Sequence, residues 1–468
     1  MSTKHDTPSL PFPIICRLGR ALLPGLLALT PVTRADELSD LRVQVHALER
    51  KIDALEQKAA IGDAAAKTAS QVTANDKGYT LASADGASSL KLRGLLQLDS
   101  RVFSGDSGLV NNSFVLRRAR LFFEGSLARN VSFQLVPEFA GGTASAATVP
   151  SILDANFVFT VDQKFQLKAG KFKSPVGLEM LQSEQATSFV ERTLVTNLVP
   201  NRDLGIQAGG ELLNGTVNYT AGLFNGVPDG GSSTNADFDN DKEGVARFLA
   251  TPFKNSDGSP VQGLSFGLAG SLGREKTTAG RTAGYKTDGQ QTFFTYNATT
   301  IADGMSWRCS PQFDYRRGAF GLFGEYVLST VNVRPSATGQ KTELQNKAWE
   351  LSTGYVLTGE DSSYYGVVPR ANFNLANRTW GAFEVVGRYS NLKVDSAAFP
   401  LYASASSNAD EATAFGLGLN WYLAKSVVFK FDYLRSKFGF APSAPDPSTN
   451  PVLRQDEKAF ITRFQLCF

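Results

Sequence analysis

The chain has very few of the residues that enzymes most often use for catalysis or for metal binding. Its 468 residues include two histidines and three cysteines, Cys16, Cys309 and Cys467. Once an exported N-terminus is removed, His46 is the last histidine, and its place in a helical repeat leaves Ser-His catalysis without a base. The two remaining cysteines predict neither a disulfide framework nor a metal site. Since the sequence also has no GxxxxGK[ST] phosphate loop, we expect no catalytic residues, no cofactor and no metal ion.

The chain also has little net charge and no long apolar run beyond its N-terminal region. Residues 1–35 hold four of the 47 basic and one of the 44 acidic residues, so 43 of each remain. That balance disfavours nucleic acid as a partner, because its binders need basic surfaces. The absence of a later stretch of about 18 apolar residues argues against transmembrane helices. The length and the 42% of hydrophobic residues fit two or three soluble domains or one large barrel.

The N-terminus has the pattern of a signal peptide for export. Basic residues precede the apolar stretch ALLPGLLALTPV, and the following TRA ends at Ala35. Small residues occupy the two positions that signal peptidase recognises. A buried soluble helix is the alternative, but Pro24 and Gly25 would interrupt it. We therefore predict a signal peptide over residues 1–35.

Residues 36–58 have the spacing of a short coiled coil. Apolar residues recur at alternating intervals of three and four: Leu38, Leu41, Val45, Leu48, Ile52 and Leu55. Three heptads are marginal alone, so the helix needs a partner, either its own chain or other copies. The next segment, residues 59–89, has the Ala/Ser/Gly composition of a flexible linker that would detach the helix. This favours an oligomerising coiled coil.

From Leu90 onward the sequence changes to a period of two, which is typical of strands with one apolar face. VLRRARLFFEGSL is interpreted with Val115 on the apolar face and with Arg118 and Arg120 on the opposite face. KLRGLLQLDSRVF, FGLGLNWYL and VVFKFDYL alternate in the same way. Strands of about 9–13 residues exceed the usual length in soluble sheets and suit a tilted membrane strand.

Short and long connections alternate along this region. Links such as VDQK, RRGA and AKS alternate with long polar ones such as NGVPDGGSSTNADFDNDKEG. Short turns at one end and long loops at the other are typical of outer-membrane barrels. We therefore predict an all-β transmembrane barrel of 16 antiparallel strands over residues 90–468. The strands are expected to start near Leu90, Phe114, Val131, Leu153, Phe165, Leu204, Thr216, Gly244, Leu264, Ser306, Phe320, Lys347, Trp380, Ala412, Val427 and Ala459.

Two segments do not fit this alternation easily. QTFFTYN, around Phe293, has strand-like residues but is assigned to a long external loop. TGEDSSYYGVVPRANFNLANRT is assigned to a long periplasmic connection. A soluble β-sandwich is the alternative fold. It is disfavoured because Trp307, Trp349 and Trp421 lie on apolar faces near strand ends, as an interfacial girdle requires.

The last nine residues, FITRFQLCF, are expected to form the strand that closes the barrel. Their even-numbered side chains are largely apolar, whereas Arg463 and Gln465 lie on the other face. Pairing with the strand near Leu90 would leave no open edge. The terminal Phe468 resembles the C-terminal signal that outer-membrane assembly machinery recognises, and we therefore expect that machinery as a partner.

A series of motifs resembles, in order and spacing, the phosphate-selective porin O and P family. The motifs are LRRARLFFEG, KAGKFKSPVGLE, ER at Glu191, NYTAGLFNG, YVLTGE, GAFEVVGRYSNL, GLNWYL and the terminal RFQLCF. The resemblance covers nearly all of residues 78–468. It implies a trimeric channel of 16 strands in the Gram-negative outer membrane, sometimes preceded by a periplasmic coiled coil. The strand count and the heptads agree with that implication.

Charged side chains that face the lumen would select ions where the channel is narrowest. By strand parity the channel-lining candidates are mostly basic: Arg93, Arg101, Arg118, Arg120, Glu124, Arg308, Arg316, Arg388, Lys430 and Arg463. A basic excess predicts a mild preference for anions. The alternative is that these charges pair across strands and only solvate the lumen.

The constriction is expected between the fifth and sixth strands, at about residues 171–203, which resemble the inward-folded third loop of the family. Its charged candidates are Lys171, Lys173, Glu191, Arg192, Arg202 and Asp203. Phosphate-selective members carry lysines after GLE, whereas this chain has Met180, Glu184 and Gln185 there. It also has Leu95 where such members often carry an arginine. Strict phosphate selectivity is therefore not expected.

Together these patterns predict an outer-membrane porin for passive diffusion of small anions, including phosphate or polyphosphate, or of other small solutes. The expected partners are outer-membrane lipid, further copies of the chain in a homotrimer, and small anionic or neutral solutes. A barrel that tethers envelope layers is the first alternative, and an outer-membrane enzyme is the second. Calcium at the acidic loop from Asp237 to Glu243 is disfavoured, because Lys242 stands where a calcium loop has its glycine.

Overall fold

The computed structural model describes residues 33–68, 70–75, 78–104, 110–140, 150–234, 237, 239–277, 284–454 and 456–468. The chain divides into two units after Thr68. The predicted signal peptide lies outside the described residues except for its last three positions. Within the described ranges, no helix combines the length and the apolarity needed to cross a membrane.

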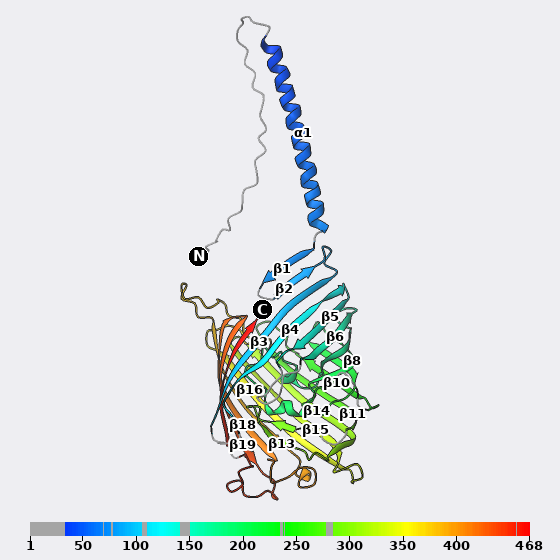
Figure 1. Cartoon of the computed structure of the whole chain (residues 1–468), viewed down its shortest axis with the longest axis vertical. Helices are drawn as coiled ribbons and strands as arrows, with labels where there is room; N and C mark the ends of the chain where they lie inside the picture. Colours follow the sequence, from blue (N-terminus) through cyan, green and yellow to red (C-terminus); the bar gives the residue numbers. More distant parts are fainter. Residues whose placement is uncertain are drawn as a thin grey trace. The chain divides into compact units, whose positions relative to one another are not determined.

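The first unit contains one long helix, α1 (Thr33–Thr68) (Figure 1). The six apolar residues of the predicted seam, from Leu38 to Leu55, are 47–65% exposed, so the helix by itself leaves the seam uncovered. The helix continues ten residues past the predicted end of the coiled coil. This segment, AAIGDAAAKT, was expected to be flexible linker, but alanine has the highest helix propensity of all residues and the helix extends through it.

The rest of the predicted linker is also partly ordered. It contains a hairpin of β1 (Gln71–Asn75) and β2 (Gly78–Ala82). Strand β2 pairs with the first residues of β3 (Ser89–Ser104), where Tyr79 lies opposite Leu92. The hairpin therefore extends the sheet beside the start of β3.

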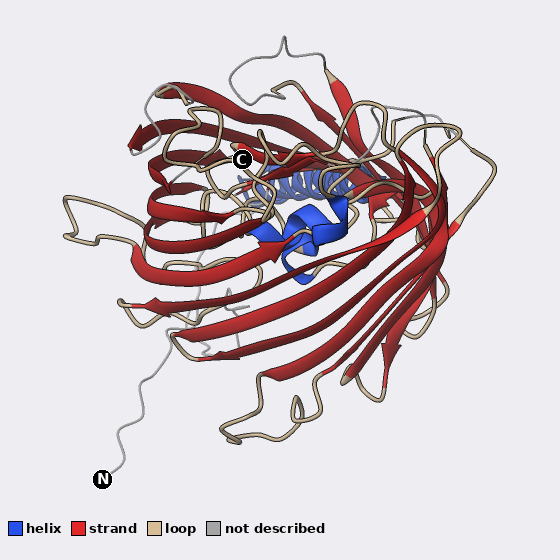
Figure 2. Cartoon of the chain, turned by 90° about the horizontal axis from the view of Figure 1, so that it is seen from below, coloured by secondary structure: helices blue, strands red, loops and turns tan. Residues whose placement is uncertain are grey.

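The second unit is built around a closed antiparallel barrel of 16 strands, which confirms the predicted fold class (Figure 2). After β3 the barrel strands are β4 (Ser113–Ala128), β5 (Val131–Glu138), β6 (Ser151–Thr160), β7 (Gln166–Lys173), β8 (Arg202–Leu212), β9 (Val217–Phe224), β10 (Glu243–Ala250), β11 (Leu264–Lys276), β14 (Ile301–Arg317), β15 (Phe320–Arg334), β16 (Thr342–Val356), β17 (Ala382–Lys393), β18 (Glu411–Ala424), β19 (Val427–Gly439) and β20 (Asp456–Cys467). Each predicted strand start lies within five residues of an observed one. Short turns such as 129–130, 318–319 and 425–426 share one end of the barrel, here called the turn end, and the opposite end is the loop end.

The two faces of the barrel wall differ as the period of two predicts. On β11, Phe266, Leu268 and Leu272 point outward and are more than half exposed, whereas Ala269 and Ser271 point inward and are buried. Aromatic side chains also gather on the outer face, and the rings of Trp349 on β16 and Tyr389 on β17 lie 5.5 Å apart. An apolar outer band with aromatic residues is the surface that lipid requires.

Strict alternation fails at one position of β4. The pairing register shifts between Gln97 and Leu98 of β3, which lie opposite Arg118 and Leu116, so Arg117 has no opposing residue. Such a β-bulge places two consecutive side chains on the same face. Arg117 and Arg118 therefore both point into the barrel, and Val115, which was predicted on the outer face, is buried on the inner face.

The last strand closes the barrel as expected. β20 pairs with β3, and Arg463 lies opposite Asp99 on the inner face. The chain end continues this pairing, because the amide of Gly94 donates to the carbonyl oxygen of Phe468 at 2.6 Å. A Cβ atom on Gly94 would lie 2.1 Å from the Phe468 ring, so glycine leaves the room in which this ring packs.

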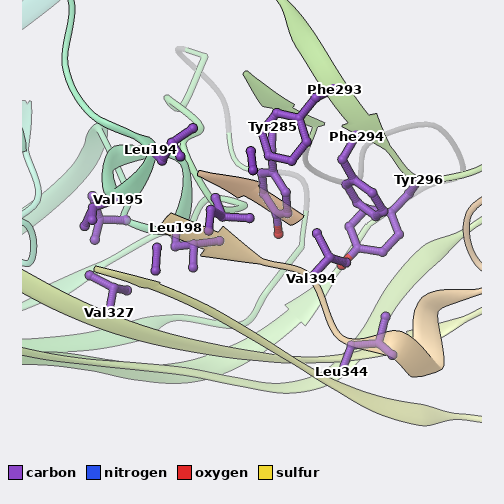
Figure 3. Packing of buried hydrophobic residues seen from close by; sticks show 14 of the residues in the cluster. Leu194, Val195, Leu198, Tyr285, Phe293, Phe294, Tyr296, Val327, Leu344 and Val394 are labelled. Carbon is purple, nitrogen blue, oxygen red and sulfur yellow. The ribbon is translucent and has the colours of Figure 1, made fainter. Parts of the chain in front are cut away.

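The interior of the barrel is only partly open, because two loops fold into it. The third loop, residues 174–201 between β7 and β8, contains the short helices α2 (Leu178–Leu181) and η1 (Leu194–Leu198). The connection between β11 and β14 forms a second insert with a hairpin of β12 (Gly284–Lys286) and β13 (Thr292–Thr295). Buried residues of both inserts and of the barrel wall form one apolar cluster, which includes Leu194, Leu198, Tyr285, Phe294, Val327 and Leu344 (Figure 3).

The β12–β13 hairpin, whose second strand lies within QTFFTYN, corrects the assignment of this segment to a long external loop. Tyr285, Phe293 and Phe294 are at most 2% exposed, and the rings of Tyr285 and Phe294 stack at 5.3 Å. Burial of these aromatic side chains, together with Tyr296, favours the insertion. The predicted periplasmic connection does join β16 and β17 at the turn end, and its Tyr364 donates a hydrogen bond to the carbonyl oxygen of Leu178 at 2.6 Å.

We predict that a charge on the outer face destabilises the barrel. Leu268→Arg, near the middle of β11, should lower the free energy of unfolding by about 2–4 kcal/mol, because the charge would face hydrocarbon. Equilibrium urea unfolding in phospholipid vesicles measures the change. Leu268→Ile is the matched control, and equal stability of the two variants would contradict the assignment of this face to lipid.

Candidate functional site

The third loop is held in place mainly by inward-facing side chains of the barrel wall. Outside its two short helices the loop has no regular structure, so its backbone N–H and C=O groups need other partners inside the barrel. Glu325 accepts from the amides of Leu178 and Glu179 at 2.8 and 3.2 Å, and Asp432 accepts from the amide of Val190 at 2.6 Å. The loop carbonyl oxygens accept from Gln97, Gln312, Arg388, Asn420, Lys430, Arg463 and Gln465.

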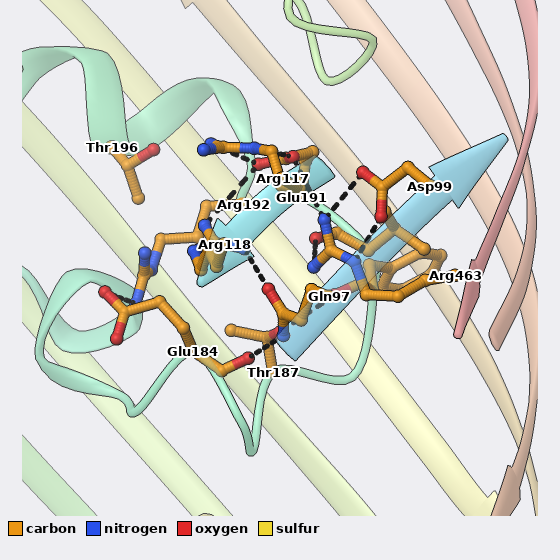
Figure 4. Close-up of polar contacts among 12 residues, drawn as sticks. Gln97, Asp99, Arg117, Arg118, Glu184, Thr187, Glu191, Arg192, Thr196 and Arg463 are labelled. Atoms are coloured by element: carbon orange, nitrogen blue, oxygen red, sulfur yellow. Dashed lines mark hydrogen bonds and ion pairs between the residues drawn. The ribbon is translucent and has the colours of Figure 1, made fainter. Parts of the chain in front are cut away.

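At the distal part of the loop, Glu191 is surrounded by arginines of the wall (Figure 4). Its carboxylate lies 2.8 Å from Arg101, 2.6 Å from Arg117 and 3.3 Å from Arg463. Arg118 is further away, at 3.9 Å, and donates to Gln97 instead. Asp99 completes the group by accepting two hydrogen bonds from Arg463.

Arg117 is the member of this group that the sequence analysis missed. Strand parity assigns it to the outer face, next to the predicted inward residue Arg118. The β-bulge turns both side chains inward, and Arg117 then makes two hydrogen bonds to Glu191. The residue type could have indicated the inward position, because the charge of an arginine has no partner on a lipid-facing surface.

A second group of basic side chains contacts Glu184, seven residues earlier in the loop. Its carboxylate lies 3.1 Å from Arg120 and 3.3 Å from Lys173, Arg192 and Arg202. Two acidic side chains of the wall share these cations, because Arg120 pairs with Glu138 at 2.5 Å and Arg202 pairs with Asp154 at 3.3 Å. The group thus contains four cations and three carboxylates.

Glu184 and Glu191 of the third loop are ionised at neutral pH. Burial alone would raise the pKa of Glu184, but the positive charges of Lys173 and Arg202 lower it well below the ordinary value. The pKa of Glu191 is lowered in the same way, because attraction by Arg117 and Arg118 outweighs its burial.

The β12–β13 insert is fastened to the third loop and to the wall. Asn197 of η1 and Lys286 exchange hydrogen bonds, with each contact at 2.9 Å. Thr287 donates to Glu457 of β20 at 2.8 Å, and Asp288 forms an ion pair with Arg388 of β17 at 2.7 Å. Burial raises the pKa of Asp288 to about 6, although Arg388 opposes the rise.

Open space remains on both sides of the third loop. A cavity of about 730 Å³ is lined by Arg117, Arg118, Arg120, Glu184, Glu191, Arg192, Arg202 and Lys286, among others. A second cavity of about 1090 Å³ is lined by Leu178 and Leu181 of the loop and by turn-end residues such as Lys254 and Gln262. The third loop therefore separates two polar chambers inside the barrel, as a constriction in a channel does.

The predicted charged residues fall into three groups. Arg118, Arg120, Glu191, Arg192 and Arg202 line the first cavity. Arg101, Arg388, Lys430 and Arg463 are at most 3% exposed and hold the third loop or its carboxylates. The remainder pair locally or are buried in the wall: Arg93 with Glu124, Arg316 with Asp314, Arg308 with Asp229 and Glu243, Lys173 with Glu184, Asp203 with the amide of Gly226, and Lys171, which is 8% exposed.

The described residues contain no cluster of three or more side chains suited to hold a metal ion. In the acidic loop, the Lys242 ammonium lies 2.6 Å from the Asp237 carboxylate. The Lys242 ammonium thus lies against a carboxylate of the loop at which the sequence analysis considers calcium and disfavours it.

A closed barrel with an apolar outer face, a charged interior and a loop that narrows the bore is an outer-membrane porin, a channel for passive diffusion. Residues 90–468 match the family described as phosphate-selective porin O and P, so the chain belongs to that family. Its location is therefore the outer membrane, and its architecture is that of a channel rather than an enzyme.

Individual relatives agree with this assignment. Porin O of Pseudomonas aeruginosa is 25% identical over 420 residues, which cover 84% of this chain and 91% of Porin O. Among solved structures, the outer membrane channel DcaP of Acinetobacter baumannii has a TM-score of 0.51 and 11% identity, with 85% of this chain and 99% of DcaP covered. OmpF of Salmonella typhi, solved with daunomycin, has a TM-score of 0.50 and 11% identity, with 85% and 100% covered. The two structures share the fold.

We predict that Glu325 controls the position of the third loop. Glu325→Leu removes the acceptor of two loop amides and should destabilise the inserted loop by about 1–3 kcal/mol, because buried amides lose their partners. Single-channel recording should then show a larger or noisier conductance. Glu325→Gln keeps one acceptor oxygen and should change the conductance less, and identical records for both variants would contradict this role.

We also predict a pH-dependent selectivity that originates at Asp288. With its pKa near 6, Asp288 is ionised at pH 7.5 and protonated at pH 5, so acidification removes one buried negative charge from the barrel interior and leaves the charge of Arg388 unbalanced. The reversal potential in a KCl gradient should shift toward anion selectivity between these pH values. Asp288→Asn is neutral throughout and should lack this part of the shift. Parallel titration curves for the wild type and the variant would contradict the assignment.

Proposed function

We propose that this porin passes small anions by passive diffusion, with a moderate preference over cations and no strict selectivity for phosphate. The observation that carries the proposal is the charge around the third loop. Eight basic side chains, Arg101, Arg117, Arg118, Arg120, Lys173, Arg192, Arg202 and Arg463, form ion pairs with five acidic ones, Asp99, Glu138, Asp154, Glu184 and Glu191. The excess of basic over acidic side chains attracts anions into the lumen, and the low-dielectric walls of the barrel strengthen this attraction.

The same contacts argue against strict phosphate selectivity. A dianion loses its hydration only where dense, unpaired positive charge replaces it. Here every one of these eight cations already has a carboxylate within 4 Å. Leu95, which is 2% exposed and points inward, adds no charge to the wall. Although the family is described as phosphate-selective, this chain pairs its basic residues internally.

Planar-bilayer recording tests the proposed function. The purified protein should give stepwise conductance. In a KCl gradient, the reversal potential should have the same sign as the chloride equilibrium potential but a smaller magnitude. Added phosphate should reduce the chloride current only weakly. Absence of conductance at any salt concentration would contradict the channel, and block by submillimolar phosphate would contradict the weak phosphate preference.

We further propose a homotrimer with the N-terminal helix in the periplasm. The uncovered seam of α1 supports oligomerisation, because six apolar side chains at heptad spacing are exposed in the single chain. The pairing of α1 with copies of itself is compatible with an additional tethering role between envelope layers. Assembly machinery that recognises the terminal Phe468 is the other proposed protein partner.

We predict that the trimer depends on this seam. Leu48→Glu places a charge on the apolar seam and should lower the temperature at which the trimer dissociates, as measured by electrophoresis of unheated and heated samples. Arg50→Glu introduces the same residue on the opposite side of the helix and is the matched control. Equal dissociation temperatures for both variants would contradict a coiled-coil contribution.

A further inference from the structure

Glu184 occupies a position in which four cations converge on a single carboxylate. Arg120 comes from β4, Lys173 from the end of β7, Arg192 from the third loop and Arg202 from the start of β8. Lys173 and Arg202 are paired neighbours on β7 and β8 and share one carboxylate oxygen with Arg192, whereas Arg120 contacts the other oxygen. Glu184 itself also lines the 730 Å³ cavity, and the group is therefore reached from the lumen.

The carboxylate of Glu184 does not satisfy these cations fully. Its Oε1 atom is shared by Lys173, Arg192 and Arg202 at 3.3 Å each, and Oε2 faces Arg120 at 3.1 Å. Charge-assisted hydrogen bonds usually measure about 2.7–2.9 Å. Elsewhere in the same wall such bonds are short, for example 2.6 and 2.8 Å between Arg463 and Asp99. Each cation also has a second acceptor: Lys173 and Arg192 donate to the carbonyl oxygen of Gln182 at 2.7 and 2.6 Å, and Arg120 and Arg202 pair with Glu138 and Asp154. The long contacts are therefore those that the Glu184 carboxylate makes.

The second loop glutamate differs from Glu184 in this respect. Glu191 contacts Arg101 and Arg117 at 2.8 and 2.6 Å, and its own carbonyl oxygen accepts from Arg388. Its side chain therefore fastens the loop to three strands. The Glu184 carboxylate also contacts three wall strands, through Arg120, Lys173 and Arg202, but at the longer distances of 3.1–3.3 Å.

We propose that Glu184 is an internal counter-ion that occupies an oxyanion site formed by Arg120, Lys173, Arg192 and Arg202. The site would otherwise bind a free tetrahedral oxyanion such as inorganic phosphate, whose four oxygen atoms match four converging donors better than two oxygens do. Because the carboxylate is tethered to the loop, its effective concentration at the site is high and external anions compete poorly. Glu184 thereby determines specificity, and this inference rests on the proposed anion channel.

The test removes the tethered charge and leaves the four cations in place. Glu184→Gln should produce a saturable reduction of chloride current by inorganic phosphate, at a phosphate concentration roughly tenfold or more below that needed for the wild type, because one competing charge is gone. The reversal potential should also shift toward the chloride equilibrium potential. Glu411→Gln, at the start of β18 and outside both cavities, removes one carboxylate elsewhere and should leave phosphate sensitivity unchanged.

The outcomes separate the inference from the proposed function. A wild-type protein without conductance would contradict the channel itself. A conducting wild type together with a conducting Glu184→Gln variant of unchanged phosphate sensitivity would overturn the role of Glu184 alone. Equal gains in phosphate sensitivity for Glu184→Gln and Glu411→Gln would also overturn it, since they would reflect net charge only. If Glu184→Gln does not assemble, Glu184→Ala removes the same charge and carries the same expectation.

Discussion

The architecture depends on one constraint, the need to satisfy the backbone polar groups of an irregular loop inside a membrane barrel. Residues 174–201 have little regular structure, and an unpaired amide or carbonyl group inside the barrel is costly. The wall meets this need with inward-facing side chains, among them Glu325, Asp432 and Arg388. Several residues that look like channel lining in the sequence therefore work as supports for the loop.

Because some inward-facing residues support the loop, only the others determine the charge of the bore. Once Arg388, Lys430 and Arg463 are covered by the loop, the cavity beside the loop is left with the side chains that face its free surface. These side chains are mainly basic on β4 and β8, but the loop brings its own carboxylates, Glu184 and Glu191, to meet them. The channel is thus narrowed and partly neutralised by the same segment, which gives the loop control over both size and charge selectivity.

The sequence predicted the strands of the barrel, but it did not predict how the loops fold inside it. Alternating residues and connection lengths located every strand of the barrel wall, because each of these strands follows a local period that lipid and lumen impose. A β-bulge has no such local signature, so Arg117 was missed and Val115 was placed on the wrong face. The β12–β13 insert was also missed, although three aromatic residues in a supposedly external loop were a signal that it packs somewhere. Which of the inward charges face water depends on long-range contacts that a single strand pattern does not contain.

We expect solutes to pass beside the third loop, through the cavity that Thr196 lines. The most direct test is single-channel conductance of a Thr196→Cys variant, with Cys309 and Cys467 replaced by serine, before and after labelling with a charged methanethiosulfonate reagent. Ser407→Cys, at an exposed loop position, is the control in the same background. Labelling of Thr196→Cys should lower the conductance, whereas labelling of the control should not. Unchanged conductance after complete labelling, verified by mass spectrometry, would contradict it.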